Sequence, residues 1–230
     1  MVKHLQNATA RLSTQPSPPT GQPVTGLQRL HLDEKRDGLV YVPPLYRPDR
    51  PIPLVLILHG AGGNAAGGLE LLHGLAEDFG LLLLAVDSRS ATWDVIIKGY
   101  GRDVQFIDQS LTQVFNTYVI DTSHLAIAGF SDGASYALSL GLTNGDLFTH
   151  VIAFSPGFMA PTEQTGEPRI FVSHGTDDQV LPIERCSRRL VPQLQEAGYD
   201  LHYEEFVGPH TVSPGIAHRA LEWFTAPAVI

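Results

Sequence analysis

The sequence has little cysteine, no long apolar run and, over its middle, no positive charge. Its one cysteine, Cys186, excludes an intrachain disulfide and any metal site built from several cysteines. The longest aliphatic runs, 54–58 and 81–86, are far too short to cross a bilayer. The first twenty residues contain no apolar signal-peptide segment. We therefore expect a cytoplasmic protein without a membrane span.

Positive charge is scarce throughout. The chain has 15 Lys and Arg against 24 Asp and Glu, a formal net charge of −9, and no Lys or Arg lies between Arg102 and Arg169. Proteins that bind nucleic acid need clustered cations to displace the counterions of the phosphates. The charge pattern therefore excludes nucleic acid as a partner and indicates an acidic middle segment.

What the chain does contain is enough apolar material for one domain, with 43% hydrophobic residues in 230. Residues 1–23 end in a proline-rich stretch, predicted to be a flexible arm, and residues 24–230 are predicted to form a single domain. Strand-like and helix-like segments alternate after it. The expected strands are 26–32, 37–42, 53–58, 81–86, 125–130, 151–155, 169–174 and 201–207, and the expected helices are 66–79, 103–118, 133–142, 183–197 and one after Ser213–Pro214.

This alternation predicts an α/β fold, a mainly parallel sheet with helices on both faces. In such sheets, functional residues lie in the loops that follow the carboxyl ends of the strands. The first such loop, 59–65, is glycine-rich and supports different interpretations. Gly60-x-Gly62-x-x-Ala65 fits a dinucleotide fingerprint, with Asp87 at the end of the next strand as its acid. Alternatively, the loop directs backbone amides at a developing oxyanion, or it is a turn without chemistry.

The loop after strand 125–130 has the pattern Gly-x-Ser-x-Gly, with Ser131 at its centre. Flanking glycines permit the tight strand-to-helix turn of a nucleophile elbow, although a buried serine in a plain glycine-rich turn would look the same. A serine nucleophile needs a base and a carboxylate that orients it. Asp177 and Asp178 follow strand 169–174, and His210 follows strand 201–207. The order Ser, Asp, His is that of one hydrolase superfamily.

Four motifs in this order resemble those of the α/β-hydrolases. They are LHGAGGN (58–64), GFSDGAS (129–135), HGTDDQVLP (174–182) and GPH (208–210). The chain is most similar to small phospholipase/carboxylesterase-type serine esterases, and its glycine-rich loop also resembles that of polyhydroxybutyrate-depolymerase-type esterases. Asp132 departs from the carboxylesterase pattern, in which Gln usually follows the nucleophile.

The resemblance implies a role for each candidate. Ser131 would be the nucleophile, His210 the base and Asp178 the orienting acid, with Asp177 as a competitor for that last role. The backbone amides of Ala61 and Asp132 would form the oxyanion hole. Two further residues, Gly62 and Trp93, are candidates for the substrate pocket, and a packing role is an equal alternative for Trp93.

Other residues are expected to have structural roles. His59 and His174 are predicted to support the loops that contain them, and His218 to lie at the surface. Residues 156–168 are too few for a lid domain, which predicts an open, lidless site for short to medium acyl esters. The acidic surroundings of Ser131 should disfavour anionic acyl groups.

The predicted activity is therefore hydrolysis of a small-molecule carboxylic ester through an acyl-enzyme, with no cofactor and no metal. A thioesterase, a lysophospholipase or a polyester hydrolase could use the same triad. Two alternatives come from other classes: a nicotinamide-dependent oxidoreductase that uses the 60–65 loop, and a non-catalytic binding protein with a hydrolase fold. The expected assembly is a monomer or a loose homodimer.

Overall fold

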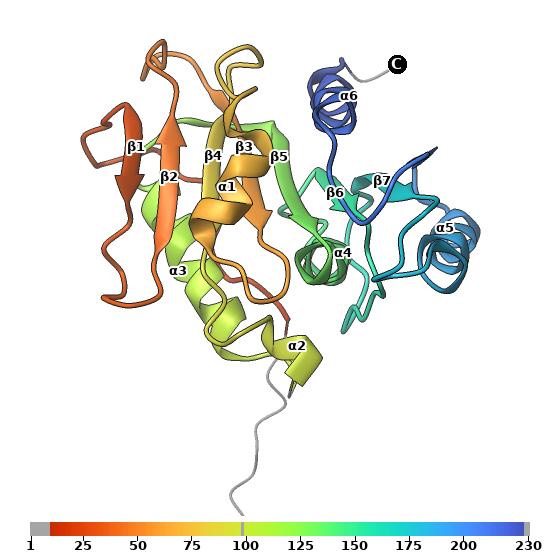
Figure 1. Ribbon diagram of the computed structural model, residues 1–230. Helices are drawn as coiled ribbons and strands as arrows, with labels where there is room; N and C mark the ends of the chain where they lie inside the picture. Colours follow the sequence, from red (N-terminus) through yellow and green to blue (C-terminus); the bar gives the residue numbers. More distant parts are fainter. Residues whose placement is uncertain (1–9, 98, 228–230) are drawn as a thin grey trace, which may run out of the picture.

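The computed structural model describes residues 10–97 and 99–227, and these residues form a central sheet flanked by helices (Figure 1). The sheet has eight strands in the order β1-β2-β4-β3-β5-β6-β7-β8, in which only the β1–β2 and β2–β4 pairs are antiparallel. The strands are β1 (Gly26–Arg29), β2 (Gly38–Val42), β3 (Ile52–Leu58), β4 (Leu82–Val86), β5 (Ile120–Phe130), β6 (His150–Phe154), β7 (Arg169–Gly175) and β8 (Leu201–Phe206). This confirms the predicted α/β fold.

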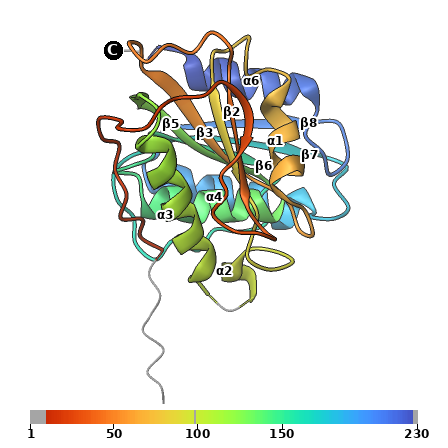
Figure 2. The same ribbon diagram turned by 90° about the vertical axis from the view of Figure 1, so that its left-hand side faces the viewer.

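Helices cover both faces of the sheet (Figure 2). They are α1 (Ala65–His73), α2 (Asp94–Ile97), α3 (Arg102–Phe115), α4 (Asp132–Thr143), α5 (Ser187–Glu196) and α6 (Pro214–Thr225), with a 3-10 turn, η1 (Ile183–Arg185), before α5. No helix in the described part of the chain is long and apolar enough to cross a membrane.

The two faces explain why the central strands are continuously apolar. Along β3, Leu54, Leu56 and Leu58 contact the core beneath α3, α4 and α5, whereas Val55 and Ile57 contact the core beneath α1 and α6. Successive side chains of a strand point to opposite faces, so a strand that is covered on both sides needs no polar residue. The same reasoning accounts for the apolar run of β4.

Several predicted boundaries differ from those observed. The expected helix 183–197 is interrupted at Cys186, whose backbone (φ −114°, ψ −104°) separates η1 from α5. The short helix α2 was not expected, and the predicted helix 66–79 ends at His73. Two of the observed helix ends have a local signal in the sequence. Gly198 has a positive φ of 87° after α5, and the Ser213 side chain accepts a hydrogen bond from the Ile216 amide at the start of α6.

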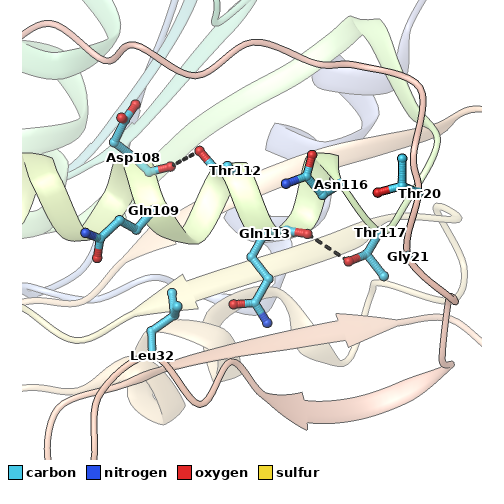
Figure 3. Close-up of a pocket in the computed structure, with 9 residues that line it drawn as sticks. All are labelled: Thr20, Gly21, Leu32, Asp108, Gln109, Thr112, Gln113, Asn116 and Thr117. Atoms are coloured by element: carbon cyan, nitrogen blue, oxygen red, sulfur yellow. Dashed lines mark hydrogen bonds between the residues drawn. The ribbon is translucent and has the colours of Figure 1, made fainter.

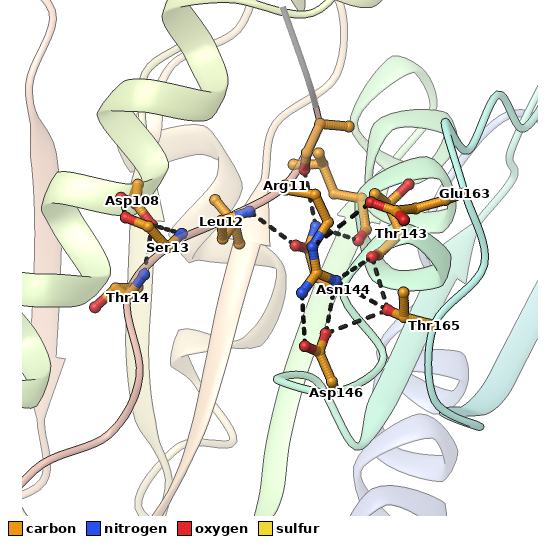
Figure 4. Close-up of polar contacts among 12 residues, drawn as sticks. Arg11, Leu12, Ser13, Thr14, Asp108, Thr143, Asn144, Asp146, Glu163 and Thr165 are labelled. Atoms are coloured by element: carbon orange, nitrogen blue, oxygen red, sulfur yellow. Dashed lines mark hydrogen bonds and ion pairs between the residues drawn. The ribbon is translucent and has the colours of Figure 1, made fainter.

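The predicted arm, 1–23, lies partly outside the described residues, at 1–9, and its remainder contains no helix or strand. The prediction of a flexible arm is wrong for residues 10–14, which are held against α3 and α4 (Figure 4). Ala10 and Leu12 are buried, and the side chain of Asn144 bonds both backbones: its Oδ1 accepts from the Leu12 amide at 2.8 Å, and its Nδ2 donates to the Ala10 carbonyl at 2.9 Å. These contacts satisfy the Leu12 amide and the Ala10 carbonyl, which belong to no helix or strand.

Charged side chains complete this attachment. The Arg11 guanidinium forms a two-bond ion pair with Asp146 at 2.8 and 2.6 Å, and the Asp108 carboxylate accepts hydrogen bonds from the amides of Ser13 and Thr14 (Figure 4). Further along the segment, a groove of about 430 Å³ remains beside α3 (Figure 3). Its lining residues are Thr20, Gly21, Leu32, Asp108, Gln109, Thr112, Gln113, Asn116 and Thr117, none of which is a candidate site residue.

The carboxyl ends of the parallel strands meet at one edge of the sheet, and this edge carries the candidate residues. The loop 59–64 follows β3, Ser131 follows β5, Asp178 follows β7 and His210 follows β8. The segment 155–168 after β6 contains no helix and only an isolated bridge from Gly166 to Gly145, in keeping with the predicted loop.

Candidate active site

Ser131 occupies a sharp turn between β5 and α4, with φ 58° and ψ −121°. A positive φ is strained for a residue with a side chain, and the turn is kept closed by the bond from the Ser131 amide to the Phe154 carbonyl at 2.9 Å. A Cβ at Gly129 would lie 2.2 Å from the Gly133 carbonyl oxygen, and one at Gly133 would lie 2.2 Å from the Leu58 carbonyl oxygen. Both flanking glycines are therefore required by close backbone approach.

His210 lies between Ser131 and Asp178. Its Nε2 is 2.8 Å from Ser131 Oγ, and its Nδ1 is 2.5 Å from Asp178 Oδ2. The ring also packs on Phe130, with centroids 4.6 Å apart. The structure thus brings together the three residues that the sequence proposed as nucleophile, base and acid, although they are distant along the chain.

Of the two adjacent aspartates, it is Asp178 whose carboxylate reaches His210. Asp178 is 5% exposed, and its Oδ1 accepts hydrogen bonds from the amides of Val180 at 2.9 Å and Leu181 at 2.8 Å. Burial by itself raises the pKa of Asp178, but the Leu181 amide and His210 outweigh it, so the pKa lies below its usual value. Asp178 is therefore a buried, ionised acceptor, whereas Asp177 is exposed.

The glycine-rich loop lies beside the nucleophile, because a Cβ at Gly60 would be 3.4 Å from Ser131 Cβ. Within the described part of the chain, the amides of Ala61 and Asp132 have no hydrogen-bond acceptor. The amide of Gly62, by contrast, donates to the Ala91 carbonyl at 2.7 Å. The two amides predicted for an oxyanion hole are therefore available to a ligand. Gly62 is exposed with φ 68°, and its place in the substrate pocket stays a prediction.

The side chain of His59 stabilises this loop through hydrogen bonds. Its Nε2 accepts a hydrogen bond from the Ser88 amide at 3.0 Å, so its proton lies on Nδ1, which donates to the Gly60 carbonyl at 2.7 Å. Burial lowers the pKa of His59, which keeps the ring neutral. The supporting role predicted for this histidine agrees with these contacts.

Trp93 does not form a wall of the substrate pocket, so that prediction is wrong and the packing alternative applies. Its side chain is 0% exposed, it stacks on Tyr136 with centroids 5.1 Å apart, and its Nε1 donates to the His59 carbonyl at 2.9 Å. An indole buried this deeply needs an acceptor for its N–H, and the backbone beneath the oxyanion loop supplies it. Trp93 therefore supports the loop rather than contacting substrate.

Thr92, which no sequence pattern indicated as a functional residue, contacts the turn that follows β5. Its Oγ1 donates to Asp132 Oδ2 at 2.6 Å and so attaches the segment after β4 to the residue that follows the nucleophile. A threonine in a surface loop has no pattern that would identify it. This contact holds the carboxylate of Asp132 toward the segment after β4.

The dinucleotide interpretation of the loop conflicts with the observed contacts. Asp87, its proposed ribose ligand, instead accepts a hydrogen bond from the Ala65 amide at 2.6 Å. That amide begins α1, where a bound pyrophosphate would have to sit. A carboxylate at this helix N-terminus would repel the pyrophosphate, which argues against a nicotinamide-dependent enzyme.

Comparison with known proteins finds a family match and several similar esterases. A profile of the phospholipase/carboxylesterase family matches residues 93–215. The probable feruloyl esterase C of Aspergillus oryzae is 29% identical over 172 residues, 71% of this chain and 63% of that protein. Feruloyl esterase C of Emericella nidulans is 26% identical over 176 residues, 73% of this chain and 64% of that protein. The chain thus spans less than two thirds of the length of these relatives.

Solved structures agree on the fold. Esterase PE8 has a TM-score of 0.67 at 22% identity and covers 83% of this chain and 98% of its own. The serine hydrolase FphF of Staphylococcus aureus has a TM-score of 0.69 at 14% identity and covers 90% of this chain and 100% of its own. Because the family profile matches more than half of the residues, the chain belongs to the phospholipase/carboxylesterase family and has the α/β-hydrolase fold.

Proposed function

We propose that this chain hydrolyses carboxylic esters through an acyl-enzyme on Ser131, with His210 as the base and Asp178 as the acid that orients it. The observation that supports this most directly is the unbroken series of hydrogen bonds from Asp178 Oδ2 to His210 Nδ1, at 2.5 Å, and from His210 Nε2 to Ser131 Oγ, at 2.8 Å. A carboxylate beside Nδ1 keeps the proton there, so the Nε2 lone pair faces the serine hydroxyl.

In the proposed reaction, Ser131 Oγ attacks the acyl carbonyl while His210 Nε2 takes the hydroxyl proton. The amides of Ala61 and Asp132 bind the oxyanion of the tetrahedral intermediate. The intermediate then collapses, and His210 returns the proton to the departing alcohol. Water, deprotonated by the same nitrogen, hydrolyses the acyl-enzyme and releases the carboxylic acid.

The loop 155–168 supports a proposal for the substrate. It has no helix that could form a lid, so we infer an open site that accepts short to medium acyl chains without activation by a lipid interface. The carboxylate of Asp132, held beside the elbow by Thr92, would repel an acyl group that carries its own negative charge. The preferred substrate is therefore a neutral ester.

The proposal is tested with Ser131→Ala. We expect kcat for p-nitrophenyl butyrate to fall by about 10⁴-fold or more, because the triad acts as a unit and its removal leaves only the remaining binding and oxyanion contacts. A fluorophosphonate probe should label the unmodified chain at Ser131 and leave the variant unlabelled. Labelling or undiminished turnover of the Ser131→Ala protein would show that another residue is the nucleophile.

A second, narrower candidate is an ester with an aromatic acyl group. Several relatives carry the name feruloyl esterase, and the segment that starts at Thr92 continues into α2, where Ile96 and Ile97 are 37% and 47% exposed. These side chains offer apolar surface for an aromatic ring. Methyl ferulate and methyl butyrate have the same leaving alcohol, so the ratio of their kcat/KM values decides between the two acyl classes. A ratio of about ten or more for ferulate would favour the aromatic candidate.

A further inference from the structure

His174 is a second histidine in contact with the carboxylate of Asp178. It lies near the end of β7, and its side chain is 0% exposed. Its Nε2 is 3.1 Å from Asp178 Oδ2 and 2.8 Å from the Leu181 carbonyl oxygen, and its Nδ1 is 2.6 Å from Ser187 Oγ. Every polar atom of this buried ring therefore has a partner at hydrogen-bond distance.

These partners determine where the proton of His174 lies. The Leu181 carbonyl can only accept, so Nε2 carries the hydrogen, and Nδ1 accepts from the Ser187 hydroxyl. Burial lowers the pKa of His174, which keeps the ring neutral at neutral pH. The neutral Nε2–H group, which donates to the Leu181 carbonyl, thus also lies beside the carboxylate of Asp178, with Nε2 3.1 Å from Oδ2, and it adds no second positive charge there.

The two oxygens of Asp178 are held differently. Oδ1 accepts from the two amides of the turn, Val180 and Leu181, whereas the polar contacts of Oδ2 with the described residues are those with the two imidazoles. We propose that His174 is a positioning residue, whose Nε2–H, aligned by Leu181 and Ser187, holds Asp178 Oδ2 in line with His210. This inference rests on the proposed triad, since it assigns His174 an effect on the base through the acid.

Other charged groups near His174 do not change their protonation state in the pH range in which His210 acts as the base. Glu205 lies opposite His174 in the β7–β8 register, and its hydrogen bond with Arg188 lowers its pKa to about 2. Burial raises the pKa of the Cys186 thiol, as does the charge of Asp178. Asp178 itself stays ionised because its pKa is lowered. A change in the acid limb of the pH–rate profile can therefore be assigned to the contact between Asp178 and His210.

The test compares His174→Leu, which removes the N–H, with His174→Gln, whose amide nitrogen can replace Nε2 as a donor. Turnover of p-nitrophenyl butyrate is measured from pH 5 to 9, per active site titrated with a fluorophosphonate. For His174→Leu we expect kcat to fall by about 10- to 100-fold with KM within about twofold. The acid limb should move to lower pH by roughly half a unit or more, because a misaligned carboxylate stabilises the imidazolium less well.

His174→Gln should recover kcat to within about threefold of the unmodified chain. The control is His150→Leu, which changes a buried histidine outside the site and should leave kcat and the position of the acid limb unchanged. An unmoved or raised acid limb in His174→Leu, or a His174→Gln variant as slow as His174→Leu, overturns the inference. If His174→Leu does not fold, Ser187→Ala provides the test, since it removes only the hydroxyl that aligns Nδ1. It should move the acid limb in the same direction, and an unmoved limb overturns the inference.

The outcome with Ser131→Ala separates this inference from the proposed function. If Ser131→Ala is inactive and unlabelled while the His174 variants behave like the unmodified chain, only the positioning role is wrong. If Ser131→Ala stays active, the triad and the inference that depends on it both fail.

Discussion

At the scale of single residues, the two adjacent aspartates after β7 differ in what they contact. The carboxylate of Asp178 is buried against His210, and that of Asp177 faces solvent. We expect Asp178→Asn to lower kcat by about 10⁴-fold, because an amide nitrogen opposite Nδ1 favours the wrong imidazole tautomer. Asp177→Asn should change kcat by no more than about threefold. Steady-state kinetics of the two variants tests this, and a larger loss in Asp177→Asn would assign the acid role to that residue.

The sequence predicted the members of this site that have a local signature. The glycines around Ser131 are required by their own turn, and Asp178 and His210 each follow an apolar strand. The contacts of Trp93 and Thr92 have no such signature, because their partners, the His59 carbonyl and Asp132, are neighbours only after folding. Residues that act through long-range contacts are therefore the ones that sequence patterns misplace.

At the scale of secondary structure, apolar runs located the central strands, but the ends of several elements depend on side chains elsewhere. Helix α2 is only four residues long and shows no periodicity. It is held by reciprocal bonds with the start of α3, since Asp94 Oδ2 accepts from the Asp103 amide at 3.0 Å and Asp103 Oδ2 accepts from the Asp94 amide at 2.7 Å. Local helix propensity does not reflect such a pair of hydrogen bonds, so α2 could not be predicted from the sequence.

The N-terminal segment is a second case in which the sequence predicts local structure but not long-range contacts. Its prolines correctly predicted that residues 10–23 form no helix or strand. They did not predict the attachment, because the partner of Leu12, Asn144, follows 132 residues later in the chain. The composition of a segment determines whether it can form a helix or strand by itself. Its attachment to the rest of the protein depends on polar groups that another element leaves available, here the side chain of Asn144 after α4.

At the scale of the whole molecule, a buried titratable side chain lies away from the candidate triad, at the opposite end of the parallel strands. The candidate triad lies at the carboxyl ends of the strands, while His150 lies at the amino end of β6, beneath Trp223 and Phe224. His150 is 4% exposed, and its Nε2 has no hydrogen-bond partner among the described residues. Burial, helped by the charge of Arg169, lowers its pKa to about 4. The ring is therefore neutral at neutral pH.

This buried imidazole should make global stability sensitive to acid. Between the usual pKa of 6.5 and the folded value of about 4, the unfolded chain binds a proton that the folded chain does not, so stability falls as the pH drops through this window. We expect His150→Leu to remove about 2 to 3 kcal/mol of the loss in unfolding free energy between pH 7 and pH 4.5. Urea unfolding at the two pH values measures it, with the half-exposed His218→Leu as the matched control. Equal losses in His150→Leu and the unmodified chain would mean that His150 is already protonated in the folded state, and the acid sensitivity would then have to come from other groups.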